Sequence, residues 1–355
     1  MPLSAAASPE GKTKASPLHM AEVLDRADMT EIAARATRFA VGTAAAPGAL
    51  RRFGRWLGSD RIFPRIPFLL VELLFVLVIF VPFLLTIYIS VLKWRANRPF
   101  ETAYFSGLEN YEAVLSSDLF WLSIARTFYF AGVAVVVELV VGFVLAMLVH
   151  QCTRSKKFYT TMFLIPMMIV PIVVGYNFSM IYIDSGPLNQ LLAPFLERIG
   201  IDPRIRWLSD PVAAQLAIII ADIWQWTSLT FLIFLSGFSA LPRQLIDAAR
   251  VMGATPLQIF WRVQLPLLKP AIVIAVIIRS MEALKMFDPV VLLTFGGPGT
   301  STQTVAYFLW EQVWVFNKFS FGAAASVLLL IMFSVLIYVG IYLLIRQRST
   351  VEGRA

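Results

Sequence analysis

The chain of 355 residues is 58% hydrophobic and only 15% charged, whereas soluble domains carry about 25% charged residues. This composition excludes an ordinary soluble protein and indicates an integral membrane protein. The net charge of +8 does not indicate nucleic-acid binding, because the Lys and Arg residues lie at the flanks of apolar stretches. Cys152, the only cysteine, excludes an internal disulfide, and neither His19 nor His150 has a second metal ligand at suitable spacing.

Residues 1–66 are predicted to form a cytoplasmic N-terminal extension. They contain no short apolar core followed by a small-residue cleavage site, so we expect no cleaved signal peptide. Residues 1–18 are rich in Ala, Ser and Pro and are expected to be disordered. Residues 48–57 intersperse arginine with large apolar residues, as an interfacial amphipathic helix on anionic lipid does. A regulatory or partner-docking role is the alternative for this segment.

Six stretches reach the roughly 20 mainly apolar residues that a spanning helix needs. They are residues 67–92, 122–149, 158–183, 212–240, 271–295 and 321–345. Prolines at 82, 166 and 171 predict kinks in the first and third spans. The sequence therefore predicts an all-α integral membrane protein, with a six-span helical bundle over residues 67–346.

The distribution of Lys and Arg predicts the orientation of the bundle. Six spans put both termini on one side, and that side, with the 150–157 and 241–270 loops, holds 20 of the 30 Lys and Arg residues. The opposite loops hold seven, namely Lys93, Arg95, Arg98, Arg198, Arg204, Arg206 and Lys318. The positive-inside rule therefore places both termini in the cytoplasm, including a tail at 347–355.

The 241–270 loop is predicted to contain two short helices. Ser239 is expected to cap the first, with Pro242 in its first turn, and Gly253 is expected to end it in the left-handed conformation. Residues 255–258 form a capping box with proline at the first helical position. They predict a second short helix that ends near residue 266.

Two capped helices at a fixed angle would form a rigid projection from the membrane. The small side chains of Ala248 and Ala249 allow another backbone to approach, and Leu257, Phe260 and Trp261 provide large apolar anchors. This pattern is typical of a docking element. The alternative is a loop that packs only on its own bundle.

The same loop resembles the EAA motif of permease subunits from bacterial binding-protein-dependent ABC importers. That motif reads Glu-Ala-Ala, three residues, Gly, nine residues, Ile-x-Leu-Pro, and lies in the cytoplasmic loop two spans before the C-terminus. The matching residues are Asp247, Ala248, Ala249, Gly253, Val263, Leu265 and Pro266. Asp247 replaces Glu and Val263 replaces Ile, both conservatively. The resemblance implies docking to a cytoplasmic ATPase through Asp247, Ala248, Ala249, Gly253, Leu257, Phe260, Leu265 and Pro266.

Two further stretches are similar to the carbohydrate-uptake branch of these permeases, which includes maltose, trehalose and glycerol-3-phosphate systems. They are residues 287–298 and 107–111, and the whole resemblance covers roughly residues 65–347. It implies the type I ABC importer fold, with the helical pair as coupling element, in the bacterial inner membrane. It also implies a sugar or polyol substrate, delivered by a periplasmic or lipid-anchored solute-binding protein.

The resemblance further implies a complex in which this chain is not an enzyme and holds no cofactor. A second, homologous permease is the expected partner, in a heterodimer as is usual in this branch, and membrane lipid surrounds both. Two cytoplasmic ABC ATPase subunits would bind ATP and Mg.

Polar residues within the spans are candidates for the substrate path, because ionisable groups at membrane depth are costly. The spacing i, i+3, i+4, i+7 predicts one helical face carrying Asp222, Gln225, Trp226 and Leu229. In the fifth span Glu282, Lys285 and Asp288 are spaced as i, i+3 neighbours. Aromatic, amide and carboxylate groups are suited to sugar recognition. For the fifth-span charges, a ladder of ion pairs that only neutralises itself is the alternative.

Three other functions compete with a sugar permease. An ion-coupled secondary transporter using the Glu282, Lys285 and Asp288 cluster would show inverted repeats, and residues 67–183 contain no second copy of the helical pair. An intramembrane enzyme is disfavoured because no nucleophile and base are paired. A glycerol-3-phosphate permease is the nearest alternative, but the predicted path has more carboxylates than cations.

Overall fold

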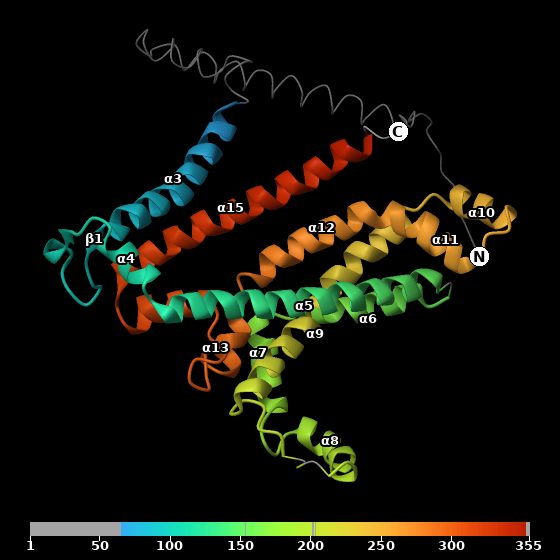
Figure 1. The fold of residues 1–355 in the computed structure, drawn as a ribbon, viewed down its shortest axis with the longest axis horizontal. Helices are drawn as coiled ribbons and strands as arrows, with labels where there is room; N and C mark the ends of the chain where they lie inside the picture. The colour runs from blue at the N-terminus through green and yellow to red at the C-terminus, as the bar shows by residue number, and fades with distance from the viewer. Residues whose placement is uncertain (1–64, 153, 201, 203, 353–355) are drawn as a thin grey trace, which may run out of the picture. The chain divides into compact units, whose positions relative to one another are not determined.

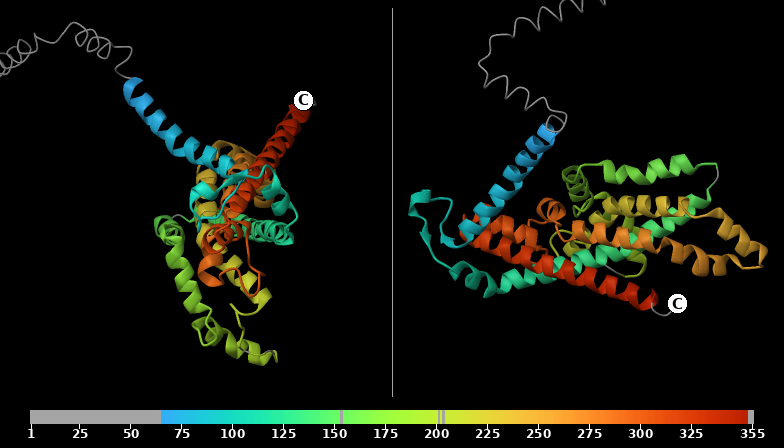
Figure 2. Two further views of the ribbon diagram at one scale, coloured as in Figure 1. Left: turned by 90° about the vertical axis from the view of Figure 1, so that its left-hand side faces the viewer. Right: turned by 90° about the horizontal axis from the view of Figure 1, so that it is seen from above.

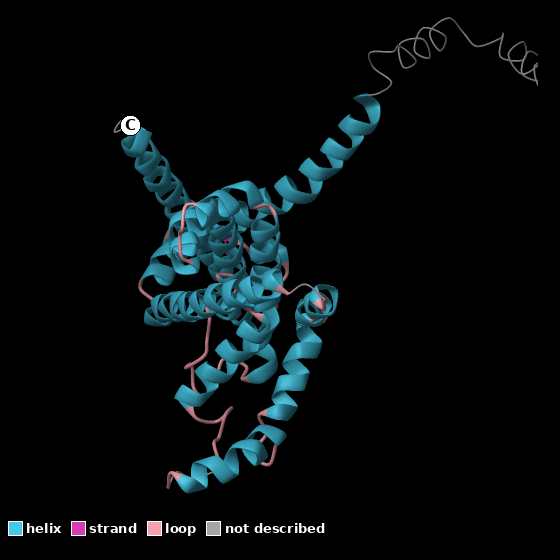
Figure 3. Ribbon diagram, turned by 90° about the vertical axis from the view of Figure 1, so that its right-hand side faces the viewer, coloured by secondary structure: helices cyan, strands magenta, loops and turns pink. Residues whose placement is uncertain are grey.

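The computed structural model describes residues 65–152, 154–200, 202 and 204–352. Across these residues the chain is helical apart from loops and one short hairpin (Figure 3), which confirms the predicted all-α fold. In the hairpin, β1 (Leu92–Lys93) pairs antiparallel with β2 (Tyr104–Phe105). The expected disordered start and the interfacial helix at 48–57 lie outside the described residues.

Five helical stretches of the described chain are long and apolar enough to cross a membrane. They are α3 (Arg65–Ser90), α5 (Asp118–Gln151), α9 (Pro211–Ser239), the stretch Pro256–Ala283 that ends with α12 (Leu265–Ala283), and α15 (Phe319–Glu352) (Figure 1). A broken helix pair provides the sixth span when it is counted as one. The chain divides into two units after Pro82, and the second contains all the described helices that come after α3.

The third span is sharply bent. It consists of α6 (Lys156–Met168) and α7 (Pro171–Ile181), which meet at 92°. Pro171 has no N–H for an intrahelical hydrogen bond, and it pushes the preceding residue toward extended backbone. Ile169 and Val170 are both extended, with ψ angles of 130° and 134°. The predicted kink is therefore a complete break of the helix.

The fifth span differs from the prediction of 271–295. Its helix starts earlier and ends at Ala283, and α13 (Asp288–Leu293) is a separate short helix. Pro289 explains the interruption, because a proline ring clashes with the carbonyl group four residues earlier, here that of Lys285. The loop between α12 and α13 carries Lys285 and leaves it exposed.

Short helices and turns connect the spans. They are η1 (Phe100–Thr102), α4 (Glu109–Leu115), α8 (Pro187–Arg198), α10 (Arg243–Val251), α11 (Pro256–Ile259), α14 (Val305–Trp310) and the π-helical turns η2 (Phe260–Gln264) and η3 (Glu311–Val315). Two long helices have side-chain caps: Ser117 accepts from the N–H of Phe120 in α5, and Asp210 accepts from Val212 in α9.

The buried core lies where α5, α9 and α12 pack against one another, with α7 and α13 at one end (Figures 1 and 2). Ile218 of α9 and Phe130 of α5 are completely buried in the largest apolar cluster. Close approach of α5 and α9 requires Gly142, because a Cβ there would lie 2.1 Å from the hydroxyl oxygen of Thr230. A second cluster around Phe308 joins α14 and α15 to α5.

Candidate functional site

The first short helix of the 241–270 loop is α10, and its predicted start was wrong. The hydroxyl of Ser239 donates to the carbonyl of Leu235 at 2.8 Å, inside α9, so it does not cap α10. Ser and Thr often bond back to the carbonyl four residues earlier when they lie within a helix. The N-cap of α10 is Pro242, which makes no side-chain capping bond.

The junction between α10 and α11 follows the prediction. Gly253 has φ of +81°, and its N–H donates to the carbonyl of Arg250 at 2.9 Å. Next, the N–H of Thr255 donates to Gln258 Oε1 at 2.9 Å and the N–H of Gln258 to Thr255 Oγ1 at 3.4 Å, so both halves of the capping box are present. The left-handed stop and the capping box fix the angle at which the chain reverses.

The second helix of the pair was predicted to end near Pro266, and this prediction was wrong. It continues from α11 through the π-helical turn η2 directly into α12, which has Pro266 in its first turn. A proline at that position can be accommodated because the π turn already changes the hydrogen-bond pattern upstream. The projecting element is therefore continuous with the fifth span, and Leu265 lies within the connection.

Large apolar side chains of the pair are exposed. Val251 is 89% exposed and Met252 81%, and Leu257 and Trp261 are also largely exposed. Contiguous exposed apolar side chains commonly mark an interaction surface. Phe260, predicted as an outward anchor, is half-buried and lies 6.1 Å from the ring of Phe143 in α5. The most exposed apolar side chains of the pair are thus Val251, Met252, Leu257 and Trp261, and we call this set the apolar ridge.

The motif residues of α10, Asp247, Ala248 and Ala249, directly precede the ridge in the chain. Asp247 is exposed and forms an ion pair with Arg250 at 3.1 Å, the kind of surface pair that contributes about 0–1 kcal/mol. Ala248 is exposed whereas Ala249 is buried at 6% exposure. The ion pair therefore adds little stability, and the Asp247 carboxylate faces solvent.

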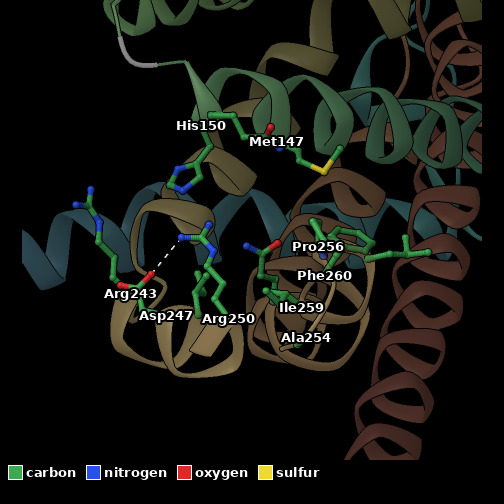
Figure 4. A pocket seen from close by; sticks show the side chains of 13 residues that line it. Met147, His150, Arg243, Asp247, Arg250, Ala254, Pro256, Ile259 and Phe260 are labelled. Carbon is green, nitrogen blue, oxygen red and sulfur yellow. Dashed lines mark hydrogen bonds and ion pairs between the residues drawn. The ribbon is translucent and has the colours of Figure 1, made fainter. Parts of the chain in front are cut away.

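A cavity of about 1300 Å³ separates α10 and α11 from the end of α5. Figure 4 shows the imidazole of His150 pointing from α5 toward α10, which contributes Arg243, Asp247 and Arg250. His150 stacks on Phe238 with ring centres 5.6 Å apart, and its buried Nδ1 has no hydrogen-bond partner among the described residues. The cavity is thus bordered by two guanidinium groups, one carboxylate and an imidazole.

Three ionisable side chains from three spans meet inside the bundle. Arg279 of α12 pairs with Glu138 of α5 and Asp222 of α9, and its Nη2 lies 2.9 Å from Glu138 Oε1. All three are buried, at 1%, 0% and 6% exposure. The guanidinium also lies 5.4 Å from the ring centre of Trp226. Asp222, predicted on the substrate path, is therefore held in an internal network that ties α5, α9 and α12 together.

Gln225 also makes an internal contact. Its Nε2 donates to the carbonyl of Ile169 at 3.0 Å, at the break between α6 and α7. Pro171 and its neighbours leave carbonyl groups there without helical partners, so Gln225 satisfies one of them. Trp226 and Leu229, on the same predicted face, are half-buried. The polar half of that face serves packing between spans, and its apolar half is partly accessible.

The fifth-span charges form only one pair of the ion-pair ladder that was the alternative to a role in the substrate path. Lys285 pairs with Glu282 at 2.8 Å, and their side chains are 65% and 42% exposed. Asp288 begins α13 and forms no ion pair with Lys285 among the described residues. The break of the helix before α13 removes the regular i, i+3 spacing between Lys285 and Asp288, on which the second pair of the ladder depended.

Sequence reasoning missed the pairing of Arg279 with Glu138. Each stands in an apolar span, and one cation near the middle of a bundle needs a carboxylate at the same depth. The available signal was that Glu138, Asp222 and Arg279 lie at equal depth in their spans. Depth is counted from the ends of a span, and the predicted ends of the fifth span were wrong. Exposure of Val251 and Met252 was also missed, because a helix end gives no periodic signal.

Comparison with known proteins identifies relatives of the bundle. The model of the family described as binding-protein-dependent transport system inner membrane component matches residues 138–350, more than half of the chain. The probable ABC transporter permease protein y4oQ of Sinorhizobium fredii is 36% identical over 252 residues, covering 71% of this chain and 79% of that protein. The trehalose/maltose transport system permease protein MalF of Thermococcus litoralis is 32% identical over 240 residues, covering 67% and 79%.

A solved structure has a similar fold. It is the crystal structure of a bacterial ABC transporter involved in the import of the acidic polysaccharide alginate, and one of its chains is similar with a TM-score of 0.68 and 19% identity. The similarity covers 82% of this chain and 98% of that chain. At this identity it establishes the shared fold.

Proposed function

The chain belongs to the binding-protein-dependent transport system inner membrane component family, as a multi-pass permease subunit of an ABC importer, and from this premise we propose that it conducts a sugar or polyol. A permease subunit of this family is not itself a catalyst. The expected cargo is supported by the trehalose/maltose permease that is 32% identical over most of its length.

The apolar ridge on α10 and α11 carries the proposal for energy coupling. Its four side chains are exposed on a helical pair that follows α9 in the chain and continues into α12. A fixed turn at Gly253 and a capping box hold the two helices at one angle, so a force on the ridge is transmitted and not absorbed locally. Asp247, Ala248 and the four ridge residues Val251, Met252, Leu257 and Trp261 are proposed to contact the partner. Ala249, Gly253, Phe260, Leu265 and Pro266 are proposed to fix the shape of the helical pair.

The proposed partner is an ABC ATPase subunit, which would bind ATP and Mg. Two ATPases, a second homologous permease in a heterodimer and a periplasmic or lipid-anchored binding protein would complete the importer. The ridge then faces the cytoplasm, as do both termini.

The proposed substrate path includes the face of α9. Trp226 and Leu229 offer partly accessible aromatic and apolar surface, while Asp222 and Gln225 hold the surrounding spans in place. Glu282, Lys285 and Asp288 are proposed to lie at the end of the path, because the Lys285 side chain is largely exposed. Family membership removes the support for an ion-coupled secondary transporter built on these charges.

Purification of the complex tests this proposal. The chain is isolated from its own membranes, and ATP hydrolysis is measured with the binding protein and neutral sugars, polyols or glycerol-3-phosphate. We expect an ATPase to co-purify and one neutral solute to stimulate it. Stimulation by glycerol-3-phosphate alone would replace the proposed cargo by its nearest alternative, and purification without any ATPase would refute the importer.

A pair of matched variants tests the ridge itself. Leu257→Asp puts a charge on the ridge, and Leu191→Asp puts one on α8, where the leucine is 75% exposed. Burying an unpaired charge in an interface is costly, so we expect Leu257→Asp to lose most of the co-purified ATPase and Leu191→Asp to keep it. Equal recovery in both variants would contradict docking through the ridge.

A further inference from the structure

A basic cleft of about 420 Å³ lies between the β1–β2 hairpin and the start of α15. Its lining includes four cationic side chains, Lys93, Arg95, Arg98 and Lys318, and no carboxylate. Tyr104 and Ser320 also line it. The cleft is distinct from the apolar ridge and from the face of α9, so the proposed transport path does not account for it.

The walls of the cleft are fixed by hydrogen bonds. Asn110, only 8% exposed, donates from Nδ2 to the carbonyls of Ser90 and Leu92 at 2.8 and 2.7 Å. The backbone N–H of Trp94 donates to Ser320 Oγ at 3.0 Å, which joins the hairpin to α15. The cationic side chains therefore project from a preorganised surface.

Most of the positive charge in the cleft is uncompensated. Lys93 pairs with Glu109 at 2.7 Å, whereas Arg95 and Arg98 form no ion pair within the described part of the chain. Lys318 lies over the ring of Phe316 at 5.6 Å, a contact that leaves its charge in place. The cleft thus presents two guanidinium groups and one ammonium that have no carboxylate partner among the residues that the structure describes. Guanidinium and ammonium groups are the ones that bind phosphate oxygens best.

The cleft lies at the ends of two spans. Lys93 is the third residue after α3, and Lys318 directly precedes α15. Aromatic side chains nearby in sequence are strongly exposed: Tyr104 at 58%, Phe105 at 75% and Trp314 at 66%. Exposed aromatic residues at span ends are typical of the membrane–water interface. These features place the cleft at headgroup depth.

The positive-inside rule does not explain these cations. In the proposed orientation the cleft is extracytoplasmic, and it gathers four of the seven Lys and Arg residues that the sequence places on that side. Charges that only set orientation belong on the other side. A ligand for the cleft accounts for their concentration.

We propose that this cleft binds the phosphodiester headgroup of an anionic phospholipid in the outer leaflet of the membrane. The choice of leaflet rests on the proposed function, whereas the choice of ligand rests on the cleft. An acidic surface of the binding protein would have matching charge, but a cleft at span ends lies within reach of lipid phosphate without any partner protein.

Native mass spectrometry of the intact complex, equilibrated with phosphatidylglycerol in phosphatidylcholine nanodiscs, tests the proposal. Arg95→Gln/Arg98→Gln removes both guanidinium groups of the cleft. Arg204→Gln/Arg206→Gln is the matched control, since these exposed arginines lie on the same predicted side outside the cleft. We expect the cleft variant to retain phosphatidylglycerol roughly tenfold more weakly, and the control to behave like the wild type. Equal retention in the cleft variant and the wild type would overturn the proposal.

A second measurement separates lipid from protein as the occupant. The affinity of the binding protein for the wild-type complex is compared with its affinity for the cleft variant, both in nanodiscs of phosphatidylcholine alone. Unchanged affinity in the cleft variant supports the lipid, and a loss there would overturn it in favour of the binding protein. Because lipid retention is counted without transport or hydrolysis, failure of the importer proposal would appear separately, as absence of the ATPase.

Discussion

The Arg279 network has one guanidinium for two buried carboxyl groups, those of Glu138 and Asp222. Removal of the guanidinium leaves both buried carboxyl groups without their cation, whereas removal of one carboxyl group leaves Arg279 paired with the other. The network therefore responds unequally to substitution of its members, and that inequality can be measured.

Arg279→Met is expected to destabilise the complex strongly, by about 3–5 kcal/mol, because it leaves Glu138 and Asp222 unpaired. Asp222→Asn keeps a hydrogen-bonding side chain and leaves Arg279 paired with Glu138, so it should cost much less. Thermal unfolding of the purified complex measures both. If Asp222→Asn lowered the stability as much as Arg279→Met, the stability of the network would not depend mainly on its single cation.

Gly253 provides a second prediction at the scale of single residues. Its φ of +81° is unfavourable for alanine, although nothing lies within 4 Å of an added Cβ. Gly200, with φ of +74° and equally open surroundings, is a matched control. Each alanine variant should cost about 1–2 kcal/mol of local strain. We expect only Gly253→Ala to lower transport per ATP hydrolysed, measured in proteoliposomes. The same loss in Gly200→Ala would show that strain alone, and not the angle of the ridge, is responsible.

At the scale of elements, the broken third span depends on a neighbour. Gln225 of α9 provides the donor for Ile169 at the break, so the bend is stabilised from outside its own helix. Gln225→Leu leaves that carbonyl unpaired, and we expect a loss of about 1–3 kcal/mol in stability. The control is Ser236→Ala, because the hydroxyl of Ser236 is exposed and donates only within α9. Equal melting temperatures for the two variants would contradict a supporting role for Gln225.

Local signals in the sequence predicted local elements well, and failed where a distant contact or a competing bond decided the outcome. Gly253 and the Thr255 capping box were predicted, because left-handed backbone and capping depend on a few adjacent residues. Ser239 was misassigned because its hydroxyl has two alternatives, capping forward or bonding back to Leu235. The pairing of Glu138 with Arg279 joins residues 141 positions apart, which no periodic pattern reports.

At the scale of the molecule, one chain of contacts connects the apolar ridge to the centre of the bundle. The ridge continues into α12, α12 carries Arg279, and Arg279 pairs with side chains of α5 and α9. Cluster packing around Phe231, Phe234 and Leu268 also joins α9 to α12. A displacement of the ridge would therefore act on three spans together, as the proposed coupling role requires.

The orientation of that assembly decides whether the ridge can meet an ATPase and whether the basic cleft faces the outer leaflet. Single cysteines at Leu257 on α11 and Leu191 on α8, both strongly exposed, are introduced into a Cys152→Ser background, which removes the only native cysteine. A membrane-impermeant thiol reagent added to intact cells should label Leu191→Cys, because the proposed orientation puts α8, which precedes the fourth span, on the outer side. Leu257→Cys should be labelled only after the membrane is opened. Labelling of Leu257→Cys in intact cells would show that the bundle has the opposite orientation. The ridge would then lie on the side of the membrane that has no ATP.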